Sequence, residues 1–274
     1  MGIKERLLEI ADSTDRYNFH SHTQFCDGRA SMEEMAEGAL RAGLLHYGFT
    51  PHSPIPIESS CNMHPDSVKL FLAEASRLKK IYKGTMEIYT GMEIDYLGDE
   101  WGASTDYFLN LPLDYRISSV HFIRNQVGEY VDVDGRPENF IRKMSEFFDS
   151  DIRYVVEQFY SRTIDMIEKG GFDIIGHFDK IGLNASKYKP GIEDEEWYVK
   201  LVEKTIDAIA GSGLIAEINT KHYSVHGRMF PDERYIDKLK RAGVPMIVNS
   251  DAHYPDLTDA SRKEGLALLK KDYS

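Results

Sequence analysis

The chain alternates short apolar runs with amphipathic stretches over nearly its whole length. Residues 31–43 show the helical part of this pattern, because Ser31 and Glu34 form a capping box at the start and Gly43 ends it. The next run, 44–49, is apolar without clean alternation, as in a strand covered on both faces. Further helices are predicted over 66–83, most of 138–170, 194–211, 232–242 and 258–271, and further strands over 17–20, 86–92, 115–122, 172–176, 214–218 and 244–249.

Parallel strands are the arrangement that this pattern favours, because the runs are short, buried and mostly followed by helices. No linker separates two domains, and no segment is low in complexity. We therefore expect an α/β fold in a single domain over residues 1–274, built as a TIM-like (β/α) barrel of about seven strands.

Histidines, carboxylates or other polar groups follow every predicted strand at its C-terminal end. In a parallel barrel these ends meet on one rim, where active sites are built. The first pair, His20 and His22, is separated by one residue, so an extended backbone turns both side chains to the same face. In chain order the set is His20, His22, Asp27, His52, Glu93, His121, His177, Asn219, Asp251 and His253.

A metal centre is the interpretation that this set supports. A lone histidine of this kind is more often a satisfied core residue, but six strands that end in His, Asp or Glu on one rim are hard to explain that way. Mixed imidazole and carboxylate ligands suit Zn, Mn or Fe. One ion needs three or four protein ligands, so the nine candidates besides Asn219 suit three divalent ions, with one bridging carboxylate and open positions for water and substrate.

The composition narrows the classes of partner. A formal net charge of −12 over 274 residues disfavours long nucleic acids and anionic membranes. No apolar run approaches the ~20 residues that cross a bilayer. The two cysteines are too few for a disulfide framework, and the charged start of the chain lacks the apolar core of a signal peptide, so we expect a cytoplasmic protein.

Six short motifs surround the candidate ligands. They are His20-Ser21-His22-Thr23, Phe49-Thr50-Pro51-His52-Ser53-Pro54, Gly91-Met92-Glu93, Ser119-Val120-His121, Gly176-His177-Phe178-Asp179 and Ser250-Asp251-Ala252-His253. In order and spacing they resemble the PHP (polymerase and histidinol phosphatase) family over roughly residues 15–255. Within the family, Ser53-Pro54, Glu93-Ile94-Asp95 and Glu217-Ile218-Asn219-Thr220 resemble the monofunctional histidinol-phosphate phosphatases.

The resemblance implies a distorted seven-stranded barrel with a trinuclear centre. It implies that the first ion is held by His20, His22, Glu93 and Asp251, the second by Glu93, His121 and His177, and the third by Asp27, His52 and His253. It also implies a metal-dependent phosphatase that hydrolyses L-histidinol phosphate to L-histidinol and phosphate in histidine biosynthesis. Glu93 and Asp251 would then be catalytic as well as metal-binding.

Three departures from the family pattern bear on the substrate. Pro51 stands where the family often has Asp, Gly182 and Leu183 where the phosphatases carry Lys or Arg, and Lys221-His222-Tyr223-Ser224 where they carry Arg. The Lys or Arg residues that the related phosphatases carry at the last two places are of the kind that holds phosphate. The metal centre is thus better supported than the substrate.

Basic groups on the rim loops are candidates to contact a phosphate. Asn219, Lys221 and Arg228 are the candidate substrate-binding residues, and His222 is a candidate proton donor to the leaving alkoxide. Lys180 and Lys187 follow the fifth strand, and any of these cations could instead be a solvated surface group. Near the site, Asp95 and Asp179 are expected to orient ligand histidines, and Glu58 could meet a substrate ammonium group.

Two other functions stay open at this point. One is a PHP-type phosphoesterase or nuclease with another substrate, and the other is a non-catalytic metal-binding or regulatory protein. The expected partner of the leading hypothesis is a small phosphate ester, with no long nucleic acid and no membrane.

Overall fold

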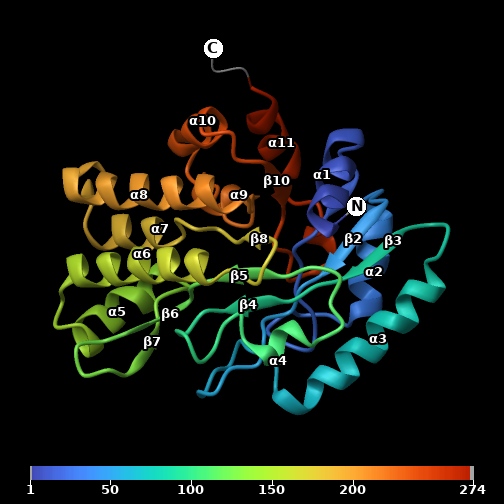
Figure 1. Cartoon of the computed structure of the whole chain (residues 1–274), viewed down its shortest axis with the longest axis horizontal. Helices are drawn as coiled ribbons and strands as arrows, with labels where there is room; N and C mark the ends of the chain where they lie inside the picture. Colours follow the sequence, from blue (N-terminus) through green and yellow to red (C-terminus); the bar gives the residue numbers. More distant parts are fainter. Residues whose placement is uncertain (1, 272–274) are drawn as a thin grey trace.

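The computed structural model describes residues 2–271. Parallel strands form its centre, and helices surround them (Figure 1). One sheet has three strands in the order β1 (Tyr17–Asn18), β2 (His46–Phe49) and β3 (Glu87–Thr90). The other has five, in the order β10 (Met246–Asn249), β9 (Ile215–Asn219), β8 (Ile174–Ile175), β5 (Ile117–Ser119) and β4 (Glu93–Asp95). The predicted α/β fold with parallel strands is confirmed.

The predicted strand 86–92 is a single bent segment that passes from one sheet to the other. Its first part, β3, pairs with β2, and after Gly91 and Met92 the chain continues as β4, which pairs with β5. Gly91 allows close packing at this bend, because a Cβ there would lie 2.8 Å from both the Thr50 methyl group and the Tyr115 ring.

The two sheets meet at two seams, and each seam lies at the rim that carries the candidate ligands. One isolated bridge joins His52 to Glu93, and the other joins Ser21 to Ala252. At the second seam, side chains replace most of the backbone ladder: for example, Asn249 Oδ1 accepts a hydrogen bond from the Phe19 backbone N–H at 2.8 Å. Each seam thus consists of candidate ligands or their immediate neighbours.

The N-terminal helix α1 (Ile3–Ser13), which the sequence pattern did not predict, covers the N-terminal end of the strands. Its buried residues Leu7 and Ile10 pack with inward-facing side chains that come from most of the strands. These side chains are Tyr17, Phe19, Tyr89, Tyr115, Ile117, Ile174, Ile215 and Ile247. This apolar cluster therefore fills the end of the strands opposite to the rim with the candidate ligands, while a larger core cluster packs around the helices.

Most predicted helices are confirmed, with shifts at their ends. They are α2 (Met32–Arg41), α3 (Val68–Ile81) after the short η1 (Pro65–Ser67), α8 (Glu196–Ser212), α10 (Glu233–Arg241) and α11 (Arg262–Lys270) after η3 (Pro255–Leu257). Residues 138–170 form two helices, α5 (Pro137–Phe147) and α6 (Ile152–Lys169). The break lies at Asp149 and Ser150, whose positive φ angles of 50° and 61° end one helix before Asp151 caps the next.

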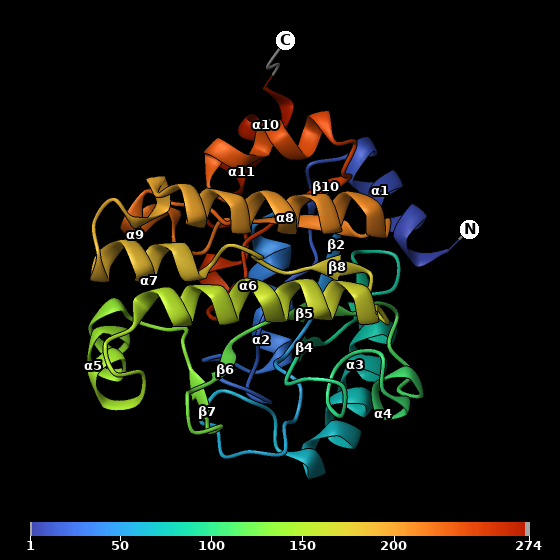
Figure 2. The same ribbon diagram turned by 60° about the vertical axis from the view of Figure 1, so that its left-hand side comes forward.

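Several short elements were not predicted. The predicted strand 115–122 ends early, because Phe122 belongs to β6 (Phe122–Arg124), which forms an antiparallel hairpin with β7 (Tyr130–Asp132). Helices α4 (Asp106–Leu109), α7 (Ile181–Tyr188) and α9 (Tyr223–His226) and the turn η2 (Ile192–Asp194) complete the described elements. Figure 2 shows α6, α7 and α8 as a helical layer over β5 and β8. Within residues 2–271, no helix combines the length and apolarity needed to cross a bilayer.

Candidate metal centre

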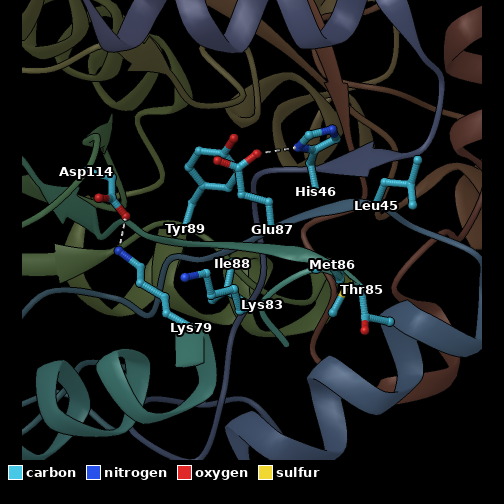
Figure 3. Close-up of a pocket in the computed structure, with 11 residues that line it drawn as sticks. Leu45, His46, Lys79, Lys83, Thr85, Met86, Glu87, Ile88, Tyr89 and Asp114 are labelled. Atoms are coloured by element: carbon cyan, nitrogen blue, oxygen red, sulfur yellow. Dashed lines mark hydrogen bonds and ion pairs between the residues drawn. The ribbon is translucent and has the colours of Figure 1, made fainter. Parts of the chain in front are cut away.

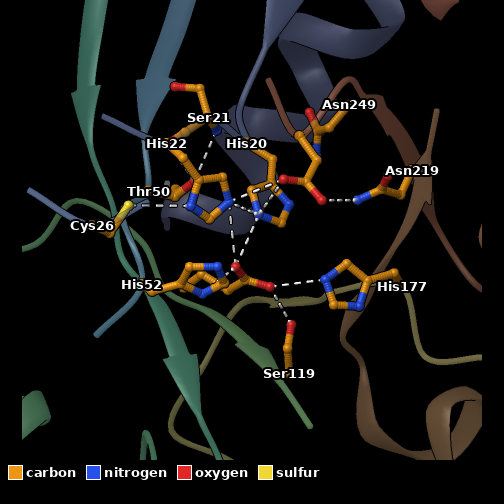
Figure 4. Close-up of polar contacts among 12 residues, drawn as sticks. His20, Ser21, His22, Cys26, Thr50, His52, Ser119, His177, Asn219 and Asn249 are labelled. Carbon is orange, nitrogen blue, oxygen red and sulfur yellow. Dashed lines mark hydrogen bonds and ion pairs between the residues drawn. The ribbon is translucent and has the colours of Figure 1, made fainter. Parts of the chain in front are cut away.

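The structure brings the nine predicted ligands together on one rim. Figure 4 shows four of them, His20, His22, His52 and His177, converging on one another. All but one of the nine fall into three groups, and within each group the possible ligand atoms all lie within 4.8 Å of one another. The groups are His22, Asp27, His52 and His253; His20, His22 and Asp251; and His52, Glu93 and His121. The ninth residue, His177, places Nε2 at 2.9 Å from Glu93 Oε1.

Glu93 lies at the centre of the cluster and is only 1% exposed. Its Oε2 atom lies 3.0 Å from His52 Nδ1 and 3.3 Å from His20 Nε2. Its Oε1 atom accepts a hydrogen bond from Ser119 Oγ at 2.8 Å and lies close to His177. One carboxylate oxygen thus faces one half of the cluster and the second oxygen faces the other half, as a bridging ligand requires.

Buried carboxylates orient two of the histidines from behind. His20 Nδ1 lies 2.6 Å from Glu217 Oε1, and His121 Nδ1 lies 2.7 Å from Asp95 Oδ1. These contacts fix the ring orientation and leave each Nε2 atom free to bind a metal ion. The expected contact of Asp95 with a candidate ligand histidine is therefore present, at His121.

The same expectation for Asp179 is wrong. Its Oδ2 atom accepts a hydrogen bond from the Asp232 backbone N–H at 2.8 Å and lies 3.4 Å from Arg228 Nη2. The sequence spacing predicted that Asp179 would contact His177. In the structure, the loop 221–231 brings Arg228 to Asp179 instead.

Several buried polar atoms of the cluster lie close to one another but make no well-aligned hydrogen bond within residues 2–271. Among them are Asp27 Oδ1, His52 Nδ1, Glu93 Oε2 and His121 Nε2. A buried polar atom without a partner is costly, so native structures nearly always satisfy such atoms. The fact that these atoms belong to the ligand groups shows that the residues fit bound cations.

The electrostatic surroundings of Asp251 and His22 favour the protonation states that bind metals. Burial opposes the charged form of Asp251, but the nearby Lys221 and His20 hold its pKa well below the ordinary value. Burial, together with the neighbouring His253 and His52, lowers the pKa of His22 well below its ordinary value. A carboxylate and a neutral imidazole are the forms that coordinate divalent ions.

A pocket of about 380 Å³ opens directly onto the ligands. Asp27, His52, His121 and His253 form part of its wall. The other lining residues are Arg29, Cys61, Asn62, Phe122, Asp132, Asp134, Gly135, Arg136, Pro137, Lys180, Lys221, His222, His226 and Tyr254. A substrate in this pocket would touch the ligand cluster and several charged side chains at once.

A second hollow, of about 660 Å³, lies at the N-terminal ends of β2 and β3 (Figure 3). Its charged groups pair locally, with Lys79 Nζ 2.5 Å from Asp114 and His46 Nδ1 3.2 Å from Glu87. It contains none of the candidate ligands, so the smaller pocket on the rim is the candidate functional site despite the larger volume of the second hollow.

The candidate phosphate-binding residues divide into two sets. Lys221 lines the pocket, with Nζ 3.3 Å from Asp251 Oδ1 and 3.2 Å from His253 Nε2. Asn219 is buried behind the ligands, where its Nδ2 donates at 3.1 Å to both Glu217 and Asp251. Asn219 therefore positions a ligand carboxylate and is not part of the pocket wall.

Arg228 lies away from the pocket. Its side chain is 10% exposed, and its Nη1 and Nη2 atoms lie 2.6 and 2.8 Å from the two carboxylate oxygens of Glu193. A Cβ on Gly182 would lie 2.4 Å from Arg228 Nη2, so this glycine makes room for the guanidinium. The geometry thus gives Arg228 a structural role in place of the predicted contact with substrate.

His222 lines the pocket, but its electrostatic surroundings do not favour a proton donor. Burial and the nearby Lys180 and Lys221 lower the pKa of His222 to about 3, so the imidazole is neutral at neutral pH in the free protein. Glu58 is exposed and lines a separate hollow in the loop 55–65. The sequence reasoning gave less weight to Lys180 and missed Asp134, because neither belongs to the motif positions.

Comparisons with known proteins agree with this geometry. The PHP domain family model matches residues 18–221. A histidinol-phosphatase from Bacillus subtilis is 28% identical over 262 residues, which cover 85% of this chain and 92% of the relative.

Two solved structures share the fold. The putative histidinol phosphatase from Listeria monocytogenes gives a TM-score of 0.78 at 19% identity, with 90% of this chain and 99% of that chain covered. The histidinol phosphate phosphatase from Lactococcus lactis, complexed with zinc, L-histidinol and phosphate, gives 0.68 at 17% identity, with 93% of both chains covered. From the rim of buried ligands and the match of the family model over most of its length, this chain belongs to the PHP domain family.

Proposed function

We propose that this protein is a metal-dependent phosphomonoesterase that hydrolyses L-histidinol phosphate to L-histidinol and phosphate. The observation that carries the proposal is the buried cluster of histidines and carboxylates that opens into a pocket lined by lysines. The name of the Bacillus subtilis relative and the ligands of the Lactococcus lactis structure support the choice of substrate.

Three divalent ions, Zn, Mn or Fe, are the cofactors that we propose. His20, His22, Glu93 and Asp251 would hold the first ion, Glu93, His121 and His177 the second, and Asp27, His52 and His253 the third. The three observed groups support this division, and His22 and His52 lie where they could reach two of the ions. Bound divalent ions would lower the pKa of water and neutralise charge on a phosphate ester.

The protein's own groups prepare the site for this chemistry. Glu93 and Asp251 hold negative charge at the rim, and their buried partners Ser119 and Asn219 fix their orientation by hydrogen bonds. Lys221 presents an ammonium group to the pocket, where it would donate charge-assisted hydrogen bonds to the phosphate oxygens. His222 lies on the same wall and would contact the substrate as a neutral imidazole.

Phosphate release from three substrates tests the proposal. We would load the protein with Mn, Zn or Fe and compare L-histidinol phosphate, an aryl phosphate and a 5′-nucleotide. A strong preference for L-histidinol phosphate is the expected result. Activity on the nucleotide alone would favour the alternative of a PHP-type nuclease. No turnover with a full complement of metal would favour a binding or regulatory protein.

A further inference from the structure

The wall of the pocket carries an ion pair that the metal ligands do not use. Lys180 Nζ lies 2.7 Å from Asp134 Oδ2, and the side chains are 9% and 26% exposed. Both residues line the pocket together with His121 and Lys221. An ammonium group and a carboxylate are therefore presented side by side to any molecule in the pocket.

Backbone hydrogen bonds hold both residues in a fixed position relative to the ligands. The Lys180 backbone N–H donates to the carbonyl of His177 at 2.9 Å, at the start of α7. Asp134 follows Val133, whose backbone N–H donates to the carbonyl of His121 at 2.9 Å. The pair is thus connected on each side to a candidate ligand, as precise recognition of a substrate requires.

The neighbouring Asp132 also lines the pocket, but it already has a cation of its own. Lys143 Nζ lies 2.8 Å from Asp132 Oδ2 and donates to the Asp132 carbonyl at 2.7 Å. Lys143 is not part of the pocket wall, so this cation does not face a molecule in the pocket. Lys180, the ion-pair partner of Asp134, in contrast lines the pocket.

A phosphate monoester changes the charge balance at this pair. Its phosphate would attract the ammonium groups of Lys180 and Lys221. If Lys180 turned to the phosphate alone, the partly buried carboxylate of Asp134 would lose its counter-charge, which is costly. A substrate with an ammonium group beside its phosphate avoids this cost, because it supplies Asp134 with a new cation.

We propose that Asp134 and Lys180 together recognise phosphate monoesters that carry an ammonium group on the carbon next to the phosphorylated one. Lys180 donates to the phosphate, and Asp134 accepts from the ammonium group. Because L-histidinol phosphate belongs to this class, the proposal rests on the proposed function. It also gives the chain a phosphate-binding cation near Gly182 and Leu183, where the related phosphatases carry Lys or Arg.

A pair of substrates that differ only in the ammonium group tests this proposal. We would measure kcat/KM for L-histidinol phosphate and for 3-(imidazol-4-yl)propyl phosphate with the metal-loaded wild type and Asp134→Asn. The wild type should prefer the amine by roughly 10- to 100-fold, the usual range for a hydrogen bond between charged groups. Asp134→Asn should bring this ratio close to one, mainly through a higher KM for the amine.

Two further variants distinguish a loss of ammonium recognition from a loss of folding or metal binding. Glu203→Gln breaks a similar ion pair with Lys238 on the outer helices and should keep the wild-type ratio. Lys180→Met should lower kcat/KM for both substrates by a similar factor and should raise the inhibition constant of inorganic phosphate. Metal content and the unfolding transition, measured for each variant, show whether the fold and the ligand cluster are intact.

The outcomes distinguish this proposal from the proposed function. If Asp134→Asn keeps the wild-type preference for the amine, the recognition role is overturned, while histidinol phosphatase activity stands. If the wild type hydrolyses an aryl phosphate but not L-histidinol phosphate, the proposed function fails. In that case O-phosphoethanolamine and ethyl phosphate make the same comparison, and equal rates for these two would overturn the recognition of the ammonium group as well.

Discussion

Glu217 contacts the candidate ligand His20 from the side away from the cluster. Its replacement by glutamine tests how much this contact contributes to stability and to metal binding. Its carboxylate is fully buried on β9. The Oε1 atom lies 2.6 Å from His20 Nδ1 and accepts from Asn249 Nδ2 at 3.0 Å. The Oε2 atom accepts from Asn219 Nδ2 at 3.1 Å and from the His177 backbone N–H at 3.2 Å. The carboxylate thus serves four donors and has no donor of its own.

In Glu217→Gln one of the two oxygens becomes an NH₂ group. If the remaining oxygen stays with His20 and Asn249, the NH₂ group faces the donors of Asn219 and His177. Each buried donor that loses its acceptor costs about 1–3 kcal/mol. For these two donors we expect the free energy of unfolding to fall by roughly 2–6 kcal/mol. Weaker orientation of His20 should also lower the metal affinity by about 10- to 100-fold.

Two measurements check these numbers. Urea unfolding of the metal-free protein gives the loss of stability, and competition with a chelator gives the change in metal affinity. Glu203→Gln, the same substitution at an exposed position of α8, serves as the control. A Glu217→Gln protein that matches this control in both measurements would refute the role of Glu217 as a shared acceptor.

Three other substitutions test separate parts of the structure. Glu93→Gln should abolish turnover and release metal, measured by metal analysis after dialysis; full activity would contradict the bridging role. Arg228→Met leaves the buried Glu193 with only the more distant Arg234, at 4.0 Å, as a cation, so the free energy of unfolding should fall by about 3–5 kcal/mol, whereas unchanged stability would contradict the structural role. Gly91→Ala should cost about 1–3 kcal/mol in the same assay, because its methyl group meets Tyr115 and Thr50, and no loss would show that the bend can relax.

The convergence of the candidate ligands on one rim could be predicted from the sequence because each candidate depends on a local signal. A buried strand followed by a histidine or a carboxylate is visible within a few residues, and parallel strands bring these positions to one rim. The same locality made α2 predictable, since Ser31 and Glu34 form the expected capping box. The helical period of the longer helices was equally visible.

The polar partners of the site could not be predicted with the same success, because they depend on contacts between distant segments. Asp179 looked like a partner of His177, but it pairs with Arg228 from another loop. Asp134 and Lys180 lie on different elements and are brought together only by the hairpin β6–β7 and the start of α7. Helix α7 itself escaped prediction, since it is short and contains Gly182.

The two seams between the sheets give bound metal ions a mechanical role. One seam joins His52 to Glu93, and the other lies between the first and last groups of ligands along the chain. An ion shared by His20 and Asp251 would act as a cross-link between opposite ends of the sequence, which restricts the unfolded chain most when the closed loop is long. Removal of metal should therefore increase amide hydrogen exchange at the seams before it does so in the strand core behind α1.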